Sequence, residues 1–383
     1  MTTRDTGMLR PIHGWIVLAA LWVGPATAVT PSTAQTHVGG DDVLPVEYGR
    51  WQRDFDAAMF EYAHVLAARG DPRSLLAAAM IAPIRFDESS GRALPTSAEP
   101  QAWFDAARVA RPADPLVAWL EATDCPMALQ CDADAGIARL LRIDGDNAAV
   151  QWLAINAALD GDDVIAARTH LRLAAQADRF QPYVGEVLKM LLEARAAVPL
   201  APMDIATAEA MSISQQSGRP TSNEEMVAVL SMSQWAAIAI PALAGVAELC
   251  QLGVDTPQRD VALQQDCESL LAKAADDDSI MVYPALALPA LIELNHGAEQ
   301  AAWRVRLREF AWLYEQAVRL LPLHEAGMGG LADYAHRMAT DGELAAMRHV
   351  LEQNGIAPQP PADWLPSNPR YRALLTTGHA PAS

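Results

Sequence analysis

The sequence predicts an all-α protein built from helical-hairpin repeats, with a less regular C-terminal half, and three observations carry this prediction. Apolar residues recur at gaps of three and four in several stretches, which is the pattern of one buried helix face. Alanine is abundant and alternating β-branched runs are absent, so strands have little support. Prolines and Asp-Gly pairs fall between the helical stretches, where turns between helices are expected.

The N-terminus has the four parts of a cleavable secretory signal. Two arginines precede the apolar run 15–23, a Gly-Pro pair ends that run, and Ala26-Thr-Ala28 is a small-residue cleavage site. The apolar run has nine residues, whereas a membrane-spanning helix needs about 20. We therefore expect residues 1–28 to be removed on export to the periplasm or the medium, with cleavage after Ala28 and no membrane span in the mature chain.

Composition divides the rest of the chain into four parts. A flexible, Gly-rich N-terminus is expected over 29–45, and an N-terminal helical repeat region over 46–214. A segment rich in Ser, Gly and Pro separates it from a C-terminal helical region over 224–376. A disordered tail over 377–383 ends the chain.

The first hairpin is expected directly after the flexible N-terminus. Apolar residues mark one helix face over 51–66, a Gly-Asp-Pro turn follows, and an Ala-rich helix over 75–82 can pack closely against the first. The polar stretch 85–98 then predicts a long loop. The same helical periodicity returns late in the chain, over 303–321.

A period typical of helical-hairpin repeats is visible between these ends. Leu120, Leu153 and Leu188 are 33 and 35 residues apart, and each follows a similar Asp-Pro, Asp-Asn or Gln-Pro start. Between the last two, the pattern predicts a helix over 147–159 and another over 163–177, with an Asp-Gly-Asp turn between them. Each of these helices begins at an Asn or Asp that can act as an N-cap.

This stretch resembles the tetratricopeptide repeat family over about residues 100–190. Trp152 occupies the family's first-helix tryptophan position, and five small or aliphatic residues occupy further packing positions: Ile155, Leu159, Ala167, Leu171 and Ala174. The sequence departs from the family at Asn156, where the family has a small glycine, and at Phe180, near the place of its closing proline. The resemblance implies an α-solenoid of stacked hairpins.

Prolines make the C-terminal half less regular. Pro241, Pro284 and Pro289 interrupt its helical stretches and predict kinks. The proline-rich tail from Gly355 is expected to wrap the last long helix through Trp364 and to fray beyond residue 376.

The charge of the chain excludes one class of partner and favours another. The formal net charge is −19, and only two lysines occur, Lys189 and Lys273. Such a surface disfavours contact with phosphate backbones, and no basic stripe with interleaved aromatics is present, so nucleic-acid binding is excluded. An acidic, concave helical surface instead suits a basic peptide or protein partner.

Four cysteines remain after the signal, and an even count in an oxidising compartment predicts disulfides. The expected pairs are Cys125 with Cys131 and Cys250 with Cys267, because each pair is close in sequence and brackets a turn. Zinc binding is one alternative, although no histidine lies near either pair and neither has C-x-x-C spacing. Buried, inert thiols are the other.

No motif specifies a reaction, a metal or a cofactor. The chain lacks G-x-S-x-G, H-E-x-x-H, P-loop and G-x-G-x-x-G patterns. The nearest approach to a site is His324-Glu325 followed by a Gly-rich turn, with Asp333 and His336 able to share a helix face. The alternative interpretation of these residues is a turn between helices with solvated histidines.

Several polar or aromatic patterns have a structural explanation. Two Asp-Gly turns, over 144–147 and 160–163, lack the ligand series of a calcium loop and suit hairpin turns with N-caps. The run 276–279 is expected to be a solvated acidic run that ends in a Ser N-cap. Trp119 and Trp152 recur at the repeat period and are expected in the core.

The leading functional hypothesis is therefore an exported helical-repeat protein that binds a protein or peptide without catalysis of its own. The alternative is an enzyme of a helical, α/α-toroid-like class that acts on a glycan or envelope substrate. A third possibility is a helical domain with a purely structural partner. An open array of helices favours binding, and a closed ring with converging carboxylates favours the enzyme.

Overall fold

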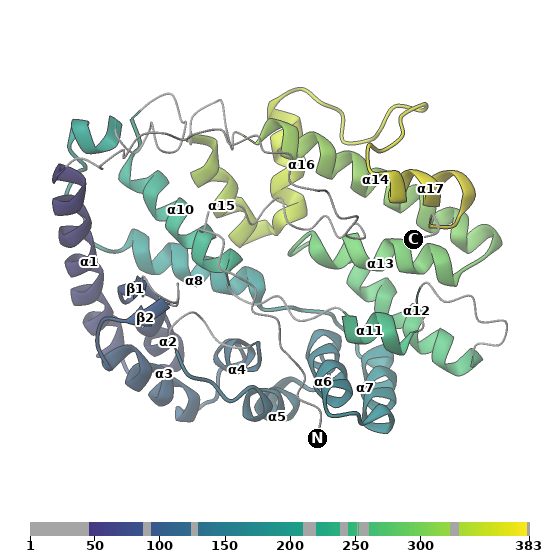
Figure 1. Ribbon diagram of the computed structural model, residues 1–383, viewed down its shortest axis with the longest axis horizontal. Helices are drawn as coiled ribbons and strands as arrows, with labels where there is room; N and C mark the ends of the chain where they lie inside the picture. Colours follow the sequence, from purple (N-terminus) through teal and green to yellow (C-terminus); the bar gives the residue numbers. More distant parts are fainter. Residues whose placement is uncertain are drawn as a thin grey trace, which may run out of the picture.

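The computed structural model describes residues 46–86, 93–123, 129–209, 220–237, 244–250, 252, 260–321 and 329–380. Over these residues the protein is almost wholly α-helical, which confirms the predicted class (Figure 1). The expected signal, its cleavage site and the whole of the expected N-terminal segment 29–45 lie outside the described residues. The named helices are α1 (Val46–Ala67), α2 (Pro72–Ile81), α3 (Glu99–Val109), α4 (Pro115–Ala122), α5 (Ala133–Asp144), α6 (Ala148–Asp160), α7 (Val164–Gln176), α8 (Val184–Ala196), α10 (Asn223–Ala236), α11 (Ala244–Leu249), α12 (Val261–Ala275), α13 (Val282–Leu294), α14 (Gly297–Leu320), α15 (Gly329–Asp341), α16 (Glu343–Gln353) and α17 (Pro369–Thr377).

Asp and Asn side chains start most helices of the N-terminal half. Each accepts a hydrogen bond from a backbone N–H of the first turn, which satisfies a donor that the helix itself leaves unpaired. Asn147 accepts from Ala149 N at 3.1 Å, and Asp163 accepts from Ala166 N at 2.9 Å, so both expected N-caps are confirmed. The two caps fix where α6 and α7 begin and leave a short turn between them.

Many consecutive helices contact each other, and further contacts close the helices into a circuit (Figure 1). The contacts run from α2 through α4, α5, α6 and α7 to α12, α13 and α14, then through α16, α15 and α8 back to α2. The chain on both sides of the segment near residue 220 therefore contributes to one circuit. The largest apolar core likewise contains residues from both halves, such as Leu120 and Leu291.

Aromatic side chains connect the two halves in this core. Trp152 on α6 has its ring centroid 6.0 Å from that of Phe180 and 6.0 Å from that of Tyr283 on α13. Trp119 on α4 is fully buried, with its ring 5.7 Å from that of Tyr183. Both tryptophans therefore pack in the core, as expected. Phe180 packs between Trp152 of α6 and Tyr283 of α13.

The expected loop over 85–98 contains secondary structure at both ends. Strand β1 (Ile84–Phe86) pairs antiparallel with β2 (Ala93–Pro95), with Ile84 opposite Pro95. The prediction that this stretch is a loop throughout is wrong, because strands of three residues are too short to produce a visible alternation of apolar and polar positions. Residues 87–92 between them lie outside the described part of the chain.

The C-terminal tail wraps α14, as the sequence predicts. The indole N–H of Trp312 donates to Ala357 O at 2.9 Å, and its ring packs edge-on against Trp364 with centroids 5.2 Å apart. Arg308 Nε donates to Trp364 O at 3.2 Å. The tail then forms one more helix, α17, that contacts α13 and α14.

Pro289 lies inside α13, where it removes one backbone donor from the helix.

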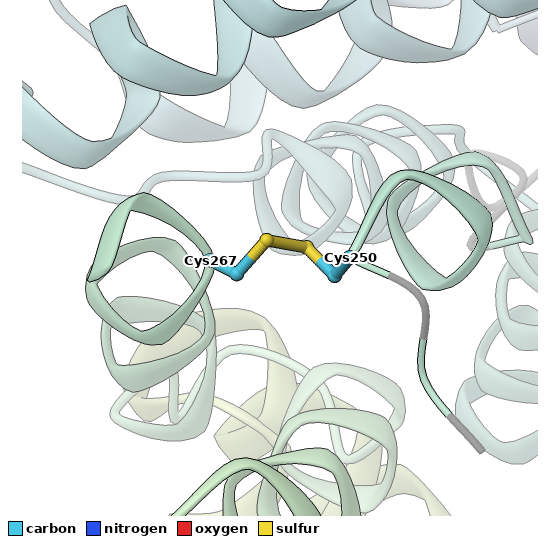
Figure 2. Close-up of a disulfide and its surroundings, with 2 residues drawn as sticks. All are labelled: Cys250 and Cys267. Carbon is cyan, nitrogen blue, oxygen red and sulfur yellow. A yellow bond between two sulfur atoms is a disulfide. The ribbon is translucent and has the colours of Figure 1, made fainter. Parts of the chain in front are cut away.

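A disulfide joins Cys250, at the end of α11, to Cys267 in α12 (Figure 2). The two Cα atoms are 5.9 Å apart, and both residues are buried. This confirms the second expected pair. Cys125 lies outside the described residues, so its pairing with Cys131 stays a prediction.

Candidate functional site

A pocket of about 220 Å³ lies between the C-terminal end of α14 and the α15–α16 hairpin. Its apolar side is formed by Leu320, Leu321 and Val350, and its polar side includes Gln353 and Asn354. The pocket therefore offers an apolar wall to the hydrocarbon part of a ligand and hydrogen-bonding groups to the polar end of that ligand. We name this cavity the α15–α16 pocket.

A glycine allows the two helices of the hairpin to approach the rest of the molecule. Gly342 joins α15 to α16 with φ at +91°, a conformation that L side chains rarely adopt. A Cβ atom there would lie 2.4 Å from Asp278 O. Gly342 thus permits both the sharp reversal and the close contact between this turn and the α12–α13 turn.

The polar side of the pocket is centred on Asp333. Arg337, one turn later on α15, donates from Nε to Asp333 Oδ2 at 3.1 Å. His349 Nε2 on α16 lies 3.6 Å from the same oxygen and 2.8 Å from Gln353 Nε2. The Asp333 side chain remains 49% exposed. The site therefore presents an accessible carboxylate that accepts a hydrogen bond from Arg337 and lies near the His349 ring.

The structure describes two of the four sequence-predicted site residues, Asp333 and His336, and only one of them lines the pocket. Asp333 lines the pocket, whereas His336 is exposed on α15 and is not among the lining residues. The basic partner that the fold brings to Asp333 from another helix is His349, which the sequence pattern did not single out for this role. His324 and Glu325 lie outside the described residues.

A buried acid lies directly behind the pocket. Tyr334 lines the cavity, and its hydroxyl lies close enough to Glu343, which is 3% exposed, for the two groups to shift each other's pKa. Glu343 Oε2 also accepts from Met281 N at 2.7 Å. Burial raises the pKa of Glu343 to about 7, the bond from Met281 opposes this rise, and the nearby Asp277 adds to it.

A second buried acid, Asp277, lies beside Glu343. Asp277 is 8% exposed and accepts from Ser279 Oγ at 2.7 Å and from Ile280 N at 3.4 Å. Burial raises its pKa to about 6, although the bonds from Ser279 and Ile280 lower it. The prediction that 276–279 is a solvated run ending in a Ser N-cap is therefore wrong for Asp277 and Ser279. The turn folds under the start of α16, and no local pattern signals that contact.

Two other buried acids, Glu121 and Asp144, have arginine partners. Glu121 is fully buried and accepts from Arg108 Nη1 at 2.9 Å and from Arg139. Asp144 is bound by Arg179 and by the Tyr183 hydroxyl at 2.8 Å. The groups that influence Glu343 and Asp277 are instead hydroxyls, backbone N–H groups and acids. We call these two residues, whose pKa values are both raised by burial, the Glu343–Asp277 pair.

Among the residues that the structure describes, no group of three His, Cys, Asp or Glu side chains is arranged to hold a metal ion. No helix in that part of the protein is both long and apolar enough to cross a membrane. Comparison with family models, with curated proteins and with solved structures gives no match for this chain.

Proposed function

We propose that this protein is exported and binds a basic protein or peptide, without catalysis of its own, with the α15–α16 pocket receiving a cationic side chain. The observation that carries the proposal is the accessible carboxylate of Asp333 in a small pocket. Arg337 and His349 both approach Oδ2, and the side chain is 49% exposed, which leaves Oδ1 for a partner's donor.

The dimensions of the pocket support a single side chain as the ligand. Its volume of about 220 Å³ falls below the range of about 300–1,000 Å³ that is typical of sites for small-molecule ligands. Leu320, Leu321 and Val350 offer an apolar wall to the methylene stem of a lysine or arginine, while its charged head reaches Asp333. The net charge of −19 attracts basic partners over longer distances.

We also propose that the N-terminal hairpins are diverged repeat units of the tetratricopeptide-like kind. Asn147 Oδ1 accepts from Gln181 N at 2.9 Å, and Ala148 N donates to Arg179 O at 2.8 Å. These bonds link the start of one hairpin to the start of the next, at positions that the sequence period makes equivalent. Stacking of this kind is how repeat units share a core.

Export rests on the N-terminal sequence and is supported by the second cysteine pair. The Cys250–Cys267 disulfide is compatible with an oxidising compartment such as the periplasm or the medium. The proposed cleavage after Ala28 is tested by N-terminal sequencing of the protein recovered from an exporting host. An intact N-terminus on correctly localised protein would contradict cleavage.

An enzyme acting on a glycan or envelope substrate is the second candidate, because two observations favour it. The helix contacts form a closed circuit, and the Glu343–Asp277 pair has pKa values of about 7 and 6, in the range useful for acid–base catalysis. One observation opposes an enzymatic function. Glu343 is only 3% exposed, and Tyr334 lies between it and the pocket. A substrate in the pocket would meet Asp333 and His349 first.

The binding proposal is tested with capped pentapeptides that carry one central lysine, arginine, norleucine or glutamate. We expect the lysine and arginine peptides to bind more tightly than the norleucine peptide, which has the same stem without the charge. Asp333→Asn removes the charge that we assign to the pocket, and Asp341→Asn, at the exposed end of the same helix, removes an equal charge elsewhere.

Calorimetric titration at low ionic strength provides the measurement. The loss of a hydrogen bond to a charged group costs about 1.5–3 kcal/mol of binding free energy. Asp333→Asn is therefore expected to lower the affinity for the lysine peptide about tenfold or more. Asp341→Asn should leave its affinity nearly unchanged. Equal effects of the two variants would contradict binding in the pocket, and turnover of any peptide or glycan by the purified protein would contradict the non-catalytic proposal.

A further inference from the structure

Tyr334 connects the α15–α16 pocket with the Glu343–Asp277 pair. One part of its side chain lines the pocket, and its hydroxyl is close enough to Glu343 for the two groups to shift each other's pKa, although the residue as a whole is only 4% exposed. A change in the charge of Glu343 therefore acts on a side chain that forms the pocket.

The pair also lies at the contact between α16 and the α12–α13 turn. Glu343 N donates to Ser279 O at 3.1 Å, and Leu344 N donates to Asp278 O at 3.2 Å. The bond from Met281 N to Glu343 Oε2 joins the same two segments. These three bonds hold the start of α16 in place, and α16 supplies His349 and Val350 to the pocket.

Charged and titratable groups face the pair from each neighbouring element. From the α12–α13 turn come Asp277 itself and Asp278, which is paired with Arg348 of α16 at 3.0 Å. The hydroxyl groups are those of Tyr283 on α13, Tyr314 on α14 and Tyr334 on α15, and the pKa of each is raised by burial and by the pair. None of these tyrosines supplies a positive charge, so two negative charges at the pair would face each other without compensation.

We propose that the Glu343–Asp277 pair acts as a pH-sensitive latch on the α15–α16 pocket, which is assembled while the pair holds a proton and loosens when both carboxyl groups ionise. This inference rests on the proposed function of the pocket as the binding site. Ionised carboxylates gain hydration only if the start of α16 separates from the turn and from Tyr334. That separation displaces two walls of the pocket.

The sign of the effect follows from the two raised pKa values. On folding, the pKa of Glu343 rises from its ordinary value of 4.5 to about 7, and the pKa of Asp277 rises from 3.8 to about 6. The folded chain therefore keeps protons that the unfolded chain releases. The free energy of unfolding falls as pH rises from the ordinary pKa values of the two acids to their raised values. Binding at the pocket should weaken in the same direction, from about pH 5 towards pH 8.

Thermal unfolding of the full mature chain tests the latch without any ligand. Glu343→Gln keeps the shape and the acceptor for Met281 N but cannot ionise, and Glu299→Gln removes an exposed carboxylate of α14 as the control. We expect the unfolding midpoint of the wild type to fall by more than about 2 °C between pH 5 and pH 8 beyond that of Glu343→Gln. Glu299→Gln should follow the wild type. Parallel profiles for all three proteins would overturn the latch.

Hydrogen exchange locates the change. After correction for the intrinsic effect of pH, amides over 334–350 of the wild type should open more often at pH 8 than at pH 6, and those of Glu343→Gln should not. A uniform change over the whole chain in both proteins would overturn the inference.

Peptide binding then separates the latch from the proposed function. The capped lysine pentapeptide should bind the wild type about tenfold more weakly at pH 8 than at pH 6, and Glu343→Gln should show a smaller ratio. Both proteins contain His349, so any contribution of its side chain is common to both. Tyr334→Phe removes the hydroxyl next to Glu343 and should reduce the change in affinity, because only the wall formed by α16 then responds to the pair, while the unfolding midpoint still falls with pH.

The possible failures are distinguishable. If the peptide binds with the same pH ratio in the wild type and in Glu343→Gln, the latch is overturned and the binding function stands. If no peptide binds at any pH while exchange over 334–350 still depends on Glu343, the proposed ligand is overturned and the latch stands as a property of the fold.

Discussion

Asn147 holds the backbone of Gln181 at both its N–H and its carbonyl group. Oδ1 accepts from Gln181 N at 2.9 Å, and Nδ2 donates to Gln181 O at 2.9 Å. The same side chain caps α6 and donates to Asp144 Oδ2 at 2.8 Å. One fully buried amide thus starts a helix and joins it to the next hairpin.

Replacing Asn147 should therefore cost more than the loss of an ordinary cap. We expect Asn147→Ala to lower the free energy of unfolding by about 3 kcal/mol, because the cap and several buried backbone partners lose their bonds together. Asp163→Ala, which removes only the exposed cap of α7, should cost about 1 kcal/mol. Urea unfolding followed by circular dichroism measures the free energy of unfolding of both variants. Equal decreases would contradict the inference that Asn147 connects its helix to the next hairpin.

Any side chain at position 342 should destabilise the protein. Its φ of +91° and the 2.4 Å approach of a Cβ to Asp278 O predict that Gly342→Ala destabilises the protein by about 2 kcal/mol or more. Gly185 in α8 has open space around its Cβ position, so Gly185→Ala should be neutral or stabilising by up to about 1 kcal/mol. The difference in unfolding midpoint between the two variants is the measurement. A neutral Gly342→Ala would show that the α12–α13 turn is free to move away.

The Cys250–Cys267 disulfide should be a main contributor to stability. It closes a segment of 17 residues, for which the loop-entropy estimate is about 3 kcal/mol. The double variant Cys250→Ser with Cys267→Ser is expected to lose about this much in urea unfolding under oxidising conditions. Mass mapping of its tryptic peptides without reduction also tests the expected Cys125–Cys131 pair, and a free thiol at either position would contradict that pair.

Glu121 should be far more sensitive than an acid in a surface ion pair. It is fully buried between Arg108 and Arg139, so Glu121→Gln leaves two arginines without their counter-charge and is expected to cost about 3 kcal/mol. The matched control is Glu186→Gln, whose partner Arg73 is 45% exposed, with an expected cost under about 1 kcal/mol. Chemical denaturation measures both, and similar costs would show that the buried acid is not compensated by its arginines.

Short-range signals predicted the helices because they act within a few residues. The cap at Asn147, the cap at Asp163 and the apolar period of α1 and α14 all lie inside the element that they define. The Cys250–Cys267 pair was predictable for the same reason, since its two residues flank a single connection.

The candidate site depends on contacts that local patterns do not contain. Met281 N and Glu343 Oε2 are 62 residues apart in sequence, and their bond exists only because α16 returns to the α12–α13 turn. Asp277 therefore looks like part of a solvated acidic run in sequence although it is buried in the fold. Asp333 was recognised as a candidate, but its partner His349 comes from the neighbouring helix rather than from its own.

The position of α8 in the circuit has a consequence for how the molecule is assembled. This helix contacts α2, α10 and α15, so it lies near the middle of the chain yet completes the connection between its two ends. A chain that emerges from its N-terminus first can stack α2 through α7, but the face of α8 that meets α15 stays exposed until about the last fifth of the sequence has followed. Such late, non-local closure slows folding, and it makes the unfinished protein, rather than the finished one, the species that most needs protection from aggregation.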